Sequence, residues 1–193
     1  MSLARVMVIG GASYLVYWAL KPRAAEASTG APEIDMGAGA IVRREDNRRP
    51  VPQTANDLLA IINANNADGW HDPRDVLATI AVESSFNPAA YRFEPHLGEA
   101  SYGLMQVLWS TARQMERGLS DPSQLYDPET NIRVGMRYQR WTWDFLRRRF
   151  GRDPTQAEWL TAYNAGVGNA AKGVIVSDYV GKHAAAKSAI SVA

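Results

Sequence analysis

The sequence predicts a mainly α protein, with a helical domain at residues 54–193 behind an apolar N-terminal segment and a linker. Asp-Pro pairs at positions 72–73, 127–128 and 153–154 precede segments in which apolar residues recur at helical spacing. An aspartate cap followed by a proline in the first turn is typical of a helix start. No long run alternates between apolar and polar residues, as a half-buried strand would, so we expect little β structure.

The composition indicates a globular protein and excludes several kinds of site. The chain has 193 residues, of which 46% are apolar and 21% charged, and its formal net charge is +1. A charge so close to zero gives no reason to expect a nucleic-acid partner. The chain contains no cysteine, which excludes disulfides, thiol nucleophiles, iron–sulfur clusters and thiolate zinc sites. Its three histidines show no metal-ligand spacing, so we expect no metal site.

The first 23 residues are predicted to form a membrane anchor. Residues 6–20 carry no charge and lie between Arg5 and Lys21. A full span needs about 20 residues, and flanking basic and aromatic side chains extend the effective length of a shorter run. A signal peptide cleaved at residues 25–27 and a buried core helix are the alternatives. Basic residues lie at both ends of the run, so the sequence does not predict the orientation in the membrane.

Residues 24–53 are predicted to be a flexible linker. The stretch is rich in Ala, Gly, Pro and charged residues and shows no apolar periodicity. We expect its arginine cluster at positions 43–49 to be solvated, as charge runs usually are. The linker would connect the anchor to the helical domain without a fixed geometry.

The helices of the domain are predicted from their start and stop signals. Apolar residues at helical spacing follow Thr54, and an Asn-Pro pair at 87–88 ends the second helix. The longest helix begins after Asp127 and ends at Gly151, a residue type that commonly terminates helices. The predicted helices cover residues 55–66, 73–85, 128–150, 154–164 and 177–188. The best strand candidate is residues 103–108.

Glu83 is the first candidate for chemistry. It shares one face of the second helix with Val76 and Ile80. We expect that face to be buried, so the Glu83 carboxyl would meet an apolar environment and the partial negative charge of the helix C-terminus. Both effects favour the protonated carboxylic acid, the form that a general acid for glycosidic bond cleavage requires.

Further motifs follow Glu83 in a defined order. The chain reads ESSFNP at 83–88, GLMQ at 103–106, LYDPETNIRVG at 125–135 and AYNAG at 162–166. Together these motifs resemble the soluble lytic transglycosylase family of lysozyme-like enzymes. The resemblance covers about residues 56–182 and implies a lysozyme-like fold for the helical domain.

The resemblance implies roles for individual residues. Glu83 corresponds to the family's single catalytic acid/base. The implied substrate-binding residues are Ser84, Gly103, Leu104, Met105, Gln106, Tyr163 and Asn164. Gln106 would contact sugar N-acetyl or hydroxyl groups and Tyr163 would orient Glu83, whereas Leu104 and Met105 fit the protein core equally well.

Two more motifs of the family are matched. Asp127, Asn131, Ile132 and Gly135 correspond to a motif that caps and packs the long helix. Tyr179-Val180 corresponds to a weaker terminal element.

The resemblance also implies the reaction. Most glycosidases use two carboxylates, but the candidates for a second one here, Glu94 and Glu99, match no catalytic position of the family. In the family's reaction Glu83 would protonate the leaving oxygen and then deprotonate the sugar's C6 hydroxyl, which attacks its own C1. The product would be a 1,6-anhydro sugar, formed without a metal or cofactor. A hydrolytic lysozyme and a non-catalytic wall-binding module are the alternatives.

The implied substrate is the glycan strand of peptidoglycan, cleaved at its MurNAc-GlcNAc β-1,4 bond. A membrane-tethered enzyme of this kind would open the wall locally, in bacterial wall remodelling or in phage genome delivery and lysis. We therefore expect the catalytic domain to reach the periplasm, with envelope or virion assembly proteins as candidate partners.

Overall fold

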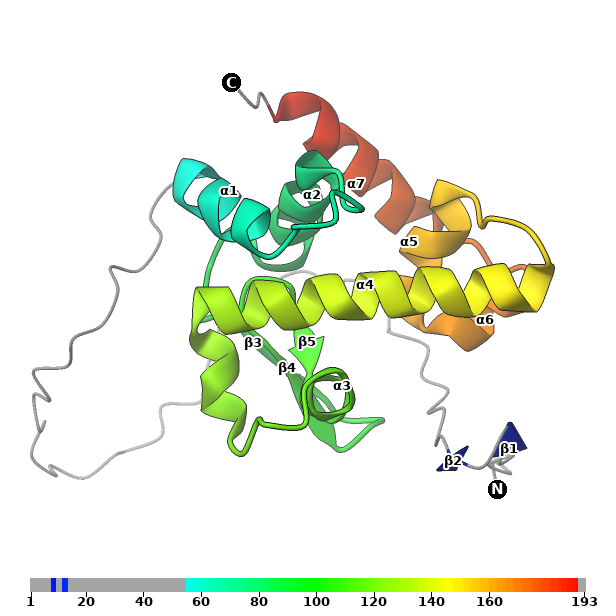
Figure 1. Ribbon diagram of the computed structural model, residues 1–193, viewed down its shortest axis with the longest axis horizontal. Coiled ribbons are helices and arrows are strands. Elements are labelled where there is room, and N and C mark those ends of the chain that lie inside the picture. Colours follow the sequence, from blue (N-terminus) through cyan, green and yellow to red (C-terminus); the bar gives the residue numbers. More distant parts are fainter. Residues whose placement is uncertain (1–7, 10–11, 14–54, 191–193) are drawn as a thin grey trace, which may run out of the picture.

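The described part of the chain is mainly helical, as the sequence predicts (Figure 1). The computed structural model describes residues 8–9, 12–13 and 55–190. The helices are α1 (Ala55–Ala64), α2 (Pro73–Ser84), α3 (Trp109–Met115), α4 (Pro128–Phe150), α5 (Gln156–Ala165), α6 (Val167–Ala171) and α7 (Ser177–Ala189), with a 3₁₀ helix η1 (Pro122–Tyr126) before α4. The strands of the helical domain are β3 (Tyr91–Glu94), β4 (Glu99–Tyr102) and β5 (Val107–Leu108).

The long helix α4 runs through the middle of the domain. In Figure 1, α1, α2 and α7 lie on one side of it, and the small sheet and α3 lie on the other. The side chain of Asp127 accepts the N–H of Thr130 at 2.9 Å, and Gly151 ends the helix with a φ of 68°. Both predicted ends of the longest helix are therefore confirmed.

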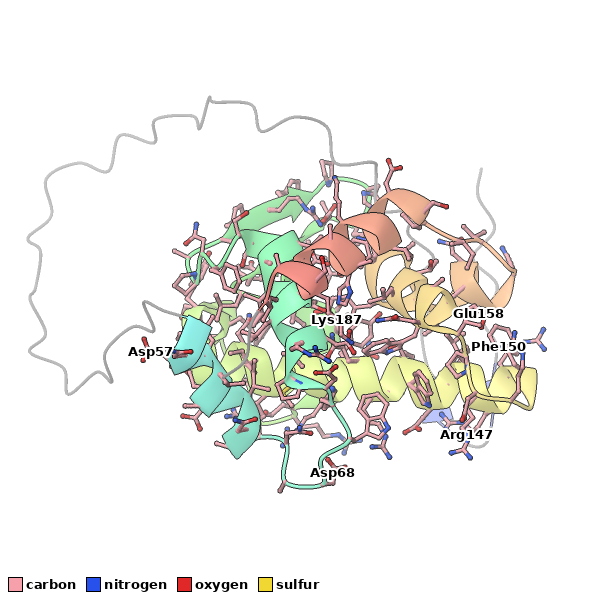
Figure 2. The ribbon with its side chains drawn as sticks, turned by 90° about the horizontal axis from the view of Figure 1, so that it is seen from above. Asp57, Asp68, Arg147, Phe150, Glu158 and Lys187 are labelled. Carbon is pink, nitrogen blue, oxygen red and sulfur yellow. The ribbon has the colours of Figure 1, made fainter. Side chains whose placement is uncertain are left out.

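The start of α5 differs from the prediction. The sequence predicts a helix from Pro154, whereas α5 begins at Gln156 because Thr155 is its cap. The Oγ1 of Thr155 accepts the N–H of Glu158 at 3.3 Å, and the Glu158 carboxylate accepts the N–H of Thr155 at 2.7 Å. This reciprocal capping box satisfies two backbone donors. Arg152 also donates to Glu158, labelled in Figure 2, and lowers the pKa of that carboxyl to about 2.

A three-stranded antiparallel sheet lies where the sequence predicts mostly loop. Its strand order is β3-β4-β5, with Tyr91 opposite Tyr102 in the register. Only β5 falls within the predicted strand at 103–108, whereas β3 and β4 lie outside it. This strand is only four residues long, and its burial runs against the alternation of its sequence, since Tyr91 and Phe93 are exposed and Glu94 is buried.

The core packs between α4 and the elements around it. Its largest fully buried side chains include Ile62, Ile80, Leu104, Met105, Leu125 and Ile132. A second cluster, Leu146, Ala162, Val167 and Ala170, joins the C-terminal half of α4 to α5 and α6. Leu104 and Met105 therefore lie in the core, the alternative that their sequence leaves open.

The N-terminal segment is described at four positions only. Val8–Ile9 (β1) and Ala12–Ser13 (β2) pair as short antiparallel strands. The rest of the predicted anchor at 1–23 and the whole predicted linker at 24–53 lie outside the described residues. Among the helices that are described, none is both long and apolar enough to cross a membrane. The anchor stays a prediction.

Candidate active site

Glu83 lies in the last turn of α2, where the backbone turns sharply. The first two residues after α2, Ser85 and Phe86, both have positive φ, at 52° and 65°. Residues other than glycine rarely adopt this conformation, which costs about 1–3 kcal/mol each and is found mostly where the surrounding structure or a function requires it. The N–H of Ser85 still bonds to the carbonyl of Ala81 at 3.1 Å, so the helix closes regularly before the chain departs. Glu83 is thus held at the very end of α2.

Glu83 is half-buried. Val76 and Ile80 on the same face of α2 are completely buried, as the sequence predicts, but Glu83 retains partial contact with solvent. The expectation of an enclosed carboxyl therefore holds only in part. A general acid needs both a protein environment and access to its substrate, and this position offers both.

Tyr179 of α7 holds the Glu83 carboxylate. Its hydroxyl donates to Oε1 of Glu83 at 2.9 Å. Burial and, secondarily, the charge of Glu83 raise the pKa of Tyr179 well above 10, so the phenol stays protonated and keeps its donor. The sequence points to Tyr179 only through the weak Tyr-Val element and assigns it no site role. This residue was missed because nothing in the chain links it to a glutamate 96 positions away.

Tyr163 of α5 connects the motif at 162–166 to the motif at 103–106. Its hydroxyl donates to the backbone carbonyl of Met105 at 2.7 Å, and its ring packs on that of Tyr138 with centroids 5.4 Å apart. Burial and the nearby charge of Glu83 raise the pKa of Tyr163 well above 10. Tyr163 therefore bonds to the 103–106 turn and lies close enough to Glu83 to be affected by its charge, and its role in orienting Glu83 stays a prediction.

The 103–106 turn is fixed by α4. Asn131 accepts the N–H of Met105 through Oδ1, and its Nδ2 donates to the carbonyls of Tyr102 and Leu125, each at 2.8 Å. Gly103 has a φ of 70°, and a Cβ there would collide with the Leu125 carbonyl and the Asn131 side chain. The glycine is thus required by packing, since Asn131 occupies the space that a side chain would need.

Gln106 closes the same turn. It is almost fully buried and has a φ of 45°, which is uncommon for a residue with a side chain. Its Nε2 donates to the carbonyls of Ala90 and Gly103, at 3.1 and 3.0 Å. These bonds join the turn to the segment that enters β3, so Gln106 shapes the backbone beside the site.

The remaining predicted substrate-binding residues fall into two groups. The side chains of Leu104 and Met105 are buried in the core, and both backbone polar groups of Met105 are already hydrogen-bonded, to Asn131 and Tyr163. Ser84 and Asn164 are half-buried at the ends of α2 and α5, and the Ser84 hydroxyl donates to the carbonyl of Ile80 at 3.1 Å.

The two candidates for a second catalytic carboxylate are both engaged in structural contacts. Glu94 is only 3% exposed and accepts from Nε of Arg92 at 2.8 Å. Glu99 accepts the N–H and the hydroxyl of Ser110 at 2.9 and 2.7 Å, and so supplies the N-terminal cap that α3 otherwise lacks. Neither carboxylate is positioned as Glu83 is, at the junction of the motifs.

Comparison with known proteins identifies the family of this chain. The Transglycosylase SLT domain family matches residues 60–179, which include every motif from Glu83 to Tyr179. The chain belongs to the SLT family. The match begins within α1 and ends in the first turn of α7, so this SLT domain contains both Glu83 and the tyrosine that holds it.

The curated relatives are longer proteins. The soluble lytic murein transglycosylase of Escherichia coli K12 is 32% identical over 123 residues, which make up 61% of this chain and 17% of that protein. The membrane-bound lytic murein transglycosylase C of Photorhabdus laumondii is 34% identical over 126 residues, 60% of this chain and 33% of that protein. The chain therefore spans a third or less of the length of these relatives. The crystal structure of the 70 kDa soluble lytic transglycosylase from Escherichia coli aligns over 70% of this chain and 20% of its own, with 28% identity and a TM-score of 0.48.

Proposed function

We propose that this SLT domain is a peptidoglycan lytic transglycosylase that cleaves the MurNAc-GlcNAc β-1,4 bond and leaves a 1,6-anhydroMurNAc end, with Glu83 as acid and base. The observation that carries the proposal is the arrangement of carboxylates. Glu83 lies at the junction of the family's motifs and is held by a protonated tyrosine, while Glu94 and Glu99 are engaged elsewhere. Family membership supports the same reaction.

A single carboxyl is sufficient for this reaction. Glu83 gives its proton to the glycosidic oxygen as the C1–O bond breaks, and the substrate's own N-acetyl group stabilises the cation at C1. The Glu83 carboxylate then takes the proton of the C6 hydroxyl, whose oxygen bonds to C1. The nucleophile already belongs to the substrate, so no water has to be held by a second carboxylate. Tyr179 would keep the same oxygen of Glu83 in place through both proton transfers.

The substrate contacts are part of the proposal. Ser84, Gln106, Tyr163 and Asn164 would line the glycan site, and the turn made by Gly103, Leu104 and Met105 would lie against it. The Nε2 nitrogen of Gln106 makes the hydrogen bonds to the carbonyls of Ala90 and Gly103. The Oε1 oxygen takes part in neither bond, and it would accept a hydrogen bond from a sugar hydroxyl or N-acetyl N–H.

Product analysis tests the reaction. Isolated peptidoglycan digested by the protein should release fragments with 1,6-anhydro ends, 18 mass units lighter (roughly one water) than the reducing fragments of a hydrolase. Glu83→Gln keeps the shape and removes the acid, so turnover should fall by at least the roughly 10²–10⁴-fold typical of general acid–base catalysis. Reducing ends would indicate a hydrolytic lysozyme. Binding to the wall without cleavage would indicate a wall-binding module.

We also propose that residues 1–23 anchor this domain in a membrane and that residues 24–53 tether it, so that it acts on the periplasmic wall beside the membrane. The uncharged run at 6–20 supports the anchor, and the linker composition supports the tether. Envelope or virion assembly proteins would then determine where the wall is opened. The full chain should partition into membranes, and a chain starting near Gln53 should remain soluble and active. A full chain of uncleaved mass in the soluble fraction would exclude the anchor.

A further inference from the structure

Helices α2 and α7 are joined by three polar contacts at regular intervals, which we call the polar ladder. The rungs are Glu83–Tyr179, Thr79–His183 and Asp75–Lys187, with distances of 2.9, 3.3 and 2.8 Å. The members are four residues apart on each helix and run in opposite order. Residues four apart share one helix face, so the two helices meet face to face and antiparallel.

The middle rung is completely enclosed. Thr79 and His183 are both 0% exposed, and Nε2 of His183 lies 3.1 Å from the carbonyl of Asp75 as well as 3.3 Å from Oγ1 of Thr79. A carbonyl only accepts, so Nε2 carries the proton and donates to it. Gln139 of α4 donates to the same Thr79 hydroxyl at 3.0 Å, which connects the ladder to the central helix.

This rung is poorly suited to a purely stabilising role. Within the described part of the chain, Nδ1 of His183 and Oε1 of Gln139 are buried without a hydrogen-bond partner. A buried polar atom left unpaired costs about 1–3 kcal/mol, and apolar side chains of similar volume would avoid that cost. What buried polar groups do provide is a defined register between helices. Moving α7 along α2 by one turn would place His183 against Glu83 and break all three rungs.

The outer rung continues the same alignment to the surface. Lys187 lies 2.8 Å from Oδ1 of Asp75 and 3.0 Å from Oδ2 of Asp72, at the start of α2. Figure 2 shows α7 lying across α2, with Lys187 where the two helices meet. The ladder therefore runs from a half-buried ion pair, through a buried histidine, to the carboxyl at the opposite end of α2.

We propose that His183 is a positioning residue for Glu83: by fixing the register of α7 on α2 through Thr79 and the Asp75 carbonyl, it places the Tyr179 hydroxyl on the carboxylate. This inference rests on the proposed function for Glu83. His183 touches no reacting atom and acts only through Tyr179, one helical turn away on the same face of α7.

Two substitutions of His183 separate positioning from packing. His183→Gln keeps an amide nitrogen near the Nε2 position and can still donate to the Asp75 carbonyl. His183→Leu fills the space without a donor. We expect kcat on peptidoglycan to fall at least 10-fold in His183→Leu, with KM within twofold, and to stay within threefold of wild type in His183→Gln. Where the leucine variant does not fold, His183→Asn, which withdraws the donor from the carbonyl, takes its place.

A double-mutant cycle with Tyr179→Phe tests the route. If His183 acts through the Tyr179 hydroxyl, His183→Leu should lower kcat less than twofold in the Tyr179→Phe background. Thr142→Val is the control, since it removes another buried hydrogen bond, from the Thr142 hydroxyl to the backbone carbonyl of Gln139 at 2.8 Å, and leaves all three rungs in place. It should lower the melting temperature and leave kcat unchanged.

The outcomes are distinct. An equal loss of kcat from His183→Leu with and without the Tyr179 hydroxyl would overturn the positioning role, and so would a loss that Thr142→Val reproduces. If the wild-type protein cleaves no wall, the proposed function fails instead. The ladder is then judged by NMR: the Tyr179 ring resonances should shift in His183→Leu and remain in place in His183→Gln. Tyr179 resonances that do not shift in His183→Leu would exclude the positioning role of His183.

Discussion

The hydroxyl of Tyr179 lies 2.9 Å from Oε1 of Glu83, although 96 positions separate the two residues in the chain. Glu83 belongs to the second helix of the domain and Tyr179 to the last. The donor that holds the carboxyl is therefore in place only when α7 has packed on α2. Formation of the site depends on completion of the fold, since α1 to α6 without α7 leave Glu83 without this contact.

Removing the Tyr179 hydroxyl should impair catalysis more than stability. A hydrogen bond to a charged group contributes about 1.5–3 kcal/mol, so Tyr179→Phe should lower kcat by about 10- to 100-fold. The phenylalanine ring still fills the buried position, so we expect the melting temperature to change little. Steady-state digestion of peptidoglycan and thermal unfolding measure the two effects. An unchanged kcat would show that Glu83 is oriented by other contacts.

Asn131→Ala should destabilise the protein strongly. The substitution leaves the N–H of Met105 and the carbonyls of Tyr102 and Leu125 without their buried partner. Unpaired buried groups cost about 1–3 kcal/mol each before relaxation, so we expect a loss of roughly 2–4 kcal/mol in the free energy of unfolding.

Asn169→Ala is the matched control for this prediction. Asn169 is half-buried, and its Nδ2 makes one bond, to the carbonyl of Ala165 at 2.8 Å. Its loss should cost about 1 kcal/mol or less. Denaturant titration of both variants measures the difference, and equal losses would show that Asn131 does not hold the 103–106 turn.

Glu94 and Glu99 should be dispensable for the chemistry. Glu99→Gln weakens the cap of α3, and a charge near a helix N-terminus contributes about 0.3–1 kcal/mol, so a small loss of stability is expected. In the double variant Glu94→Gln/Glu99→Gln the products should keep their 1,6-anhydro ends. Mass spectrometry of the fragments checks this. Wild-type reducing ends that disappear in the double variant would identify one of the two residues as the second carboxylate of a hydrolase.

Some elements could be predicted from the sequence because their signals are local. Asp127 and Gly151 fix the two ends of α4 by a side-chain cap and a left-handed residue, and both effects act within one helical turn. The motif around Glu83 likewise predicts the end of α2. The strand β3 could not be predicted in this way, since it is only four residues long and its aromatic face, Tyr91 and Phe93, is exposed and not packed on the core.

The rest of the site depends on contacts that no local pattern encodes. The role of Glu99 as the cap of α3 requires the fold of the sheet to bring it to Ser110. Tyr179 reaches Glu83 only through the register of α7 on α2. The resemblance to a family indicates which segments of the chain carry the motifs, but it does not indicate which of their side chains are in contact.

Two histidines, the half-buried His71 and the buried His183, should make stability depend on pH. Burial lowers the pKa of His71 from 6.5 to about 4. The charge of Asp68 opposes this shift, whereas the charge of Arg140 adds to it. Burial is also the largest cause of the lowered pKa of His183. Around His183, the carbonyl and charge of Asp75 and the charge of Glu83 oppose the shift, whereas Lys187 adds to it.

The free energy of unfolding should therefore fall as the pH is lowered from about 6.5 toward 4.5. In that window the unfolded chain binds protons at His71 and His183 that the folded protein does not, which favours unfolding by up to about 1.4 kcal/mol per pH unit for each histidine. Carboxyls with lowered pKa values, such as those of Glu116 and Glu158, start from an ordinary value of 4.5 and lose their stabilisation mainly below it. Urea unfolding at pH 7.5, 6.0 and 5.0 measures the slope. The double variant His71→Gln/His183→Gln should be nearly independent of pH over this range whatever its absolute stability, because glutamine does not titrate. If the slope of the wild type persisted in that variant, the histidines would not be its source.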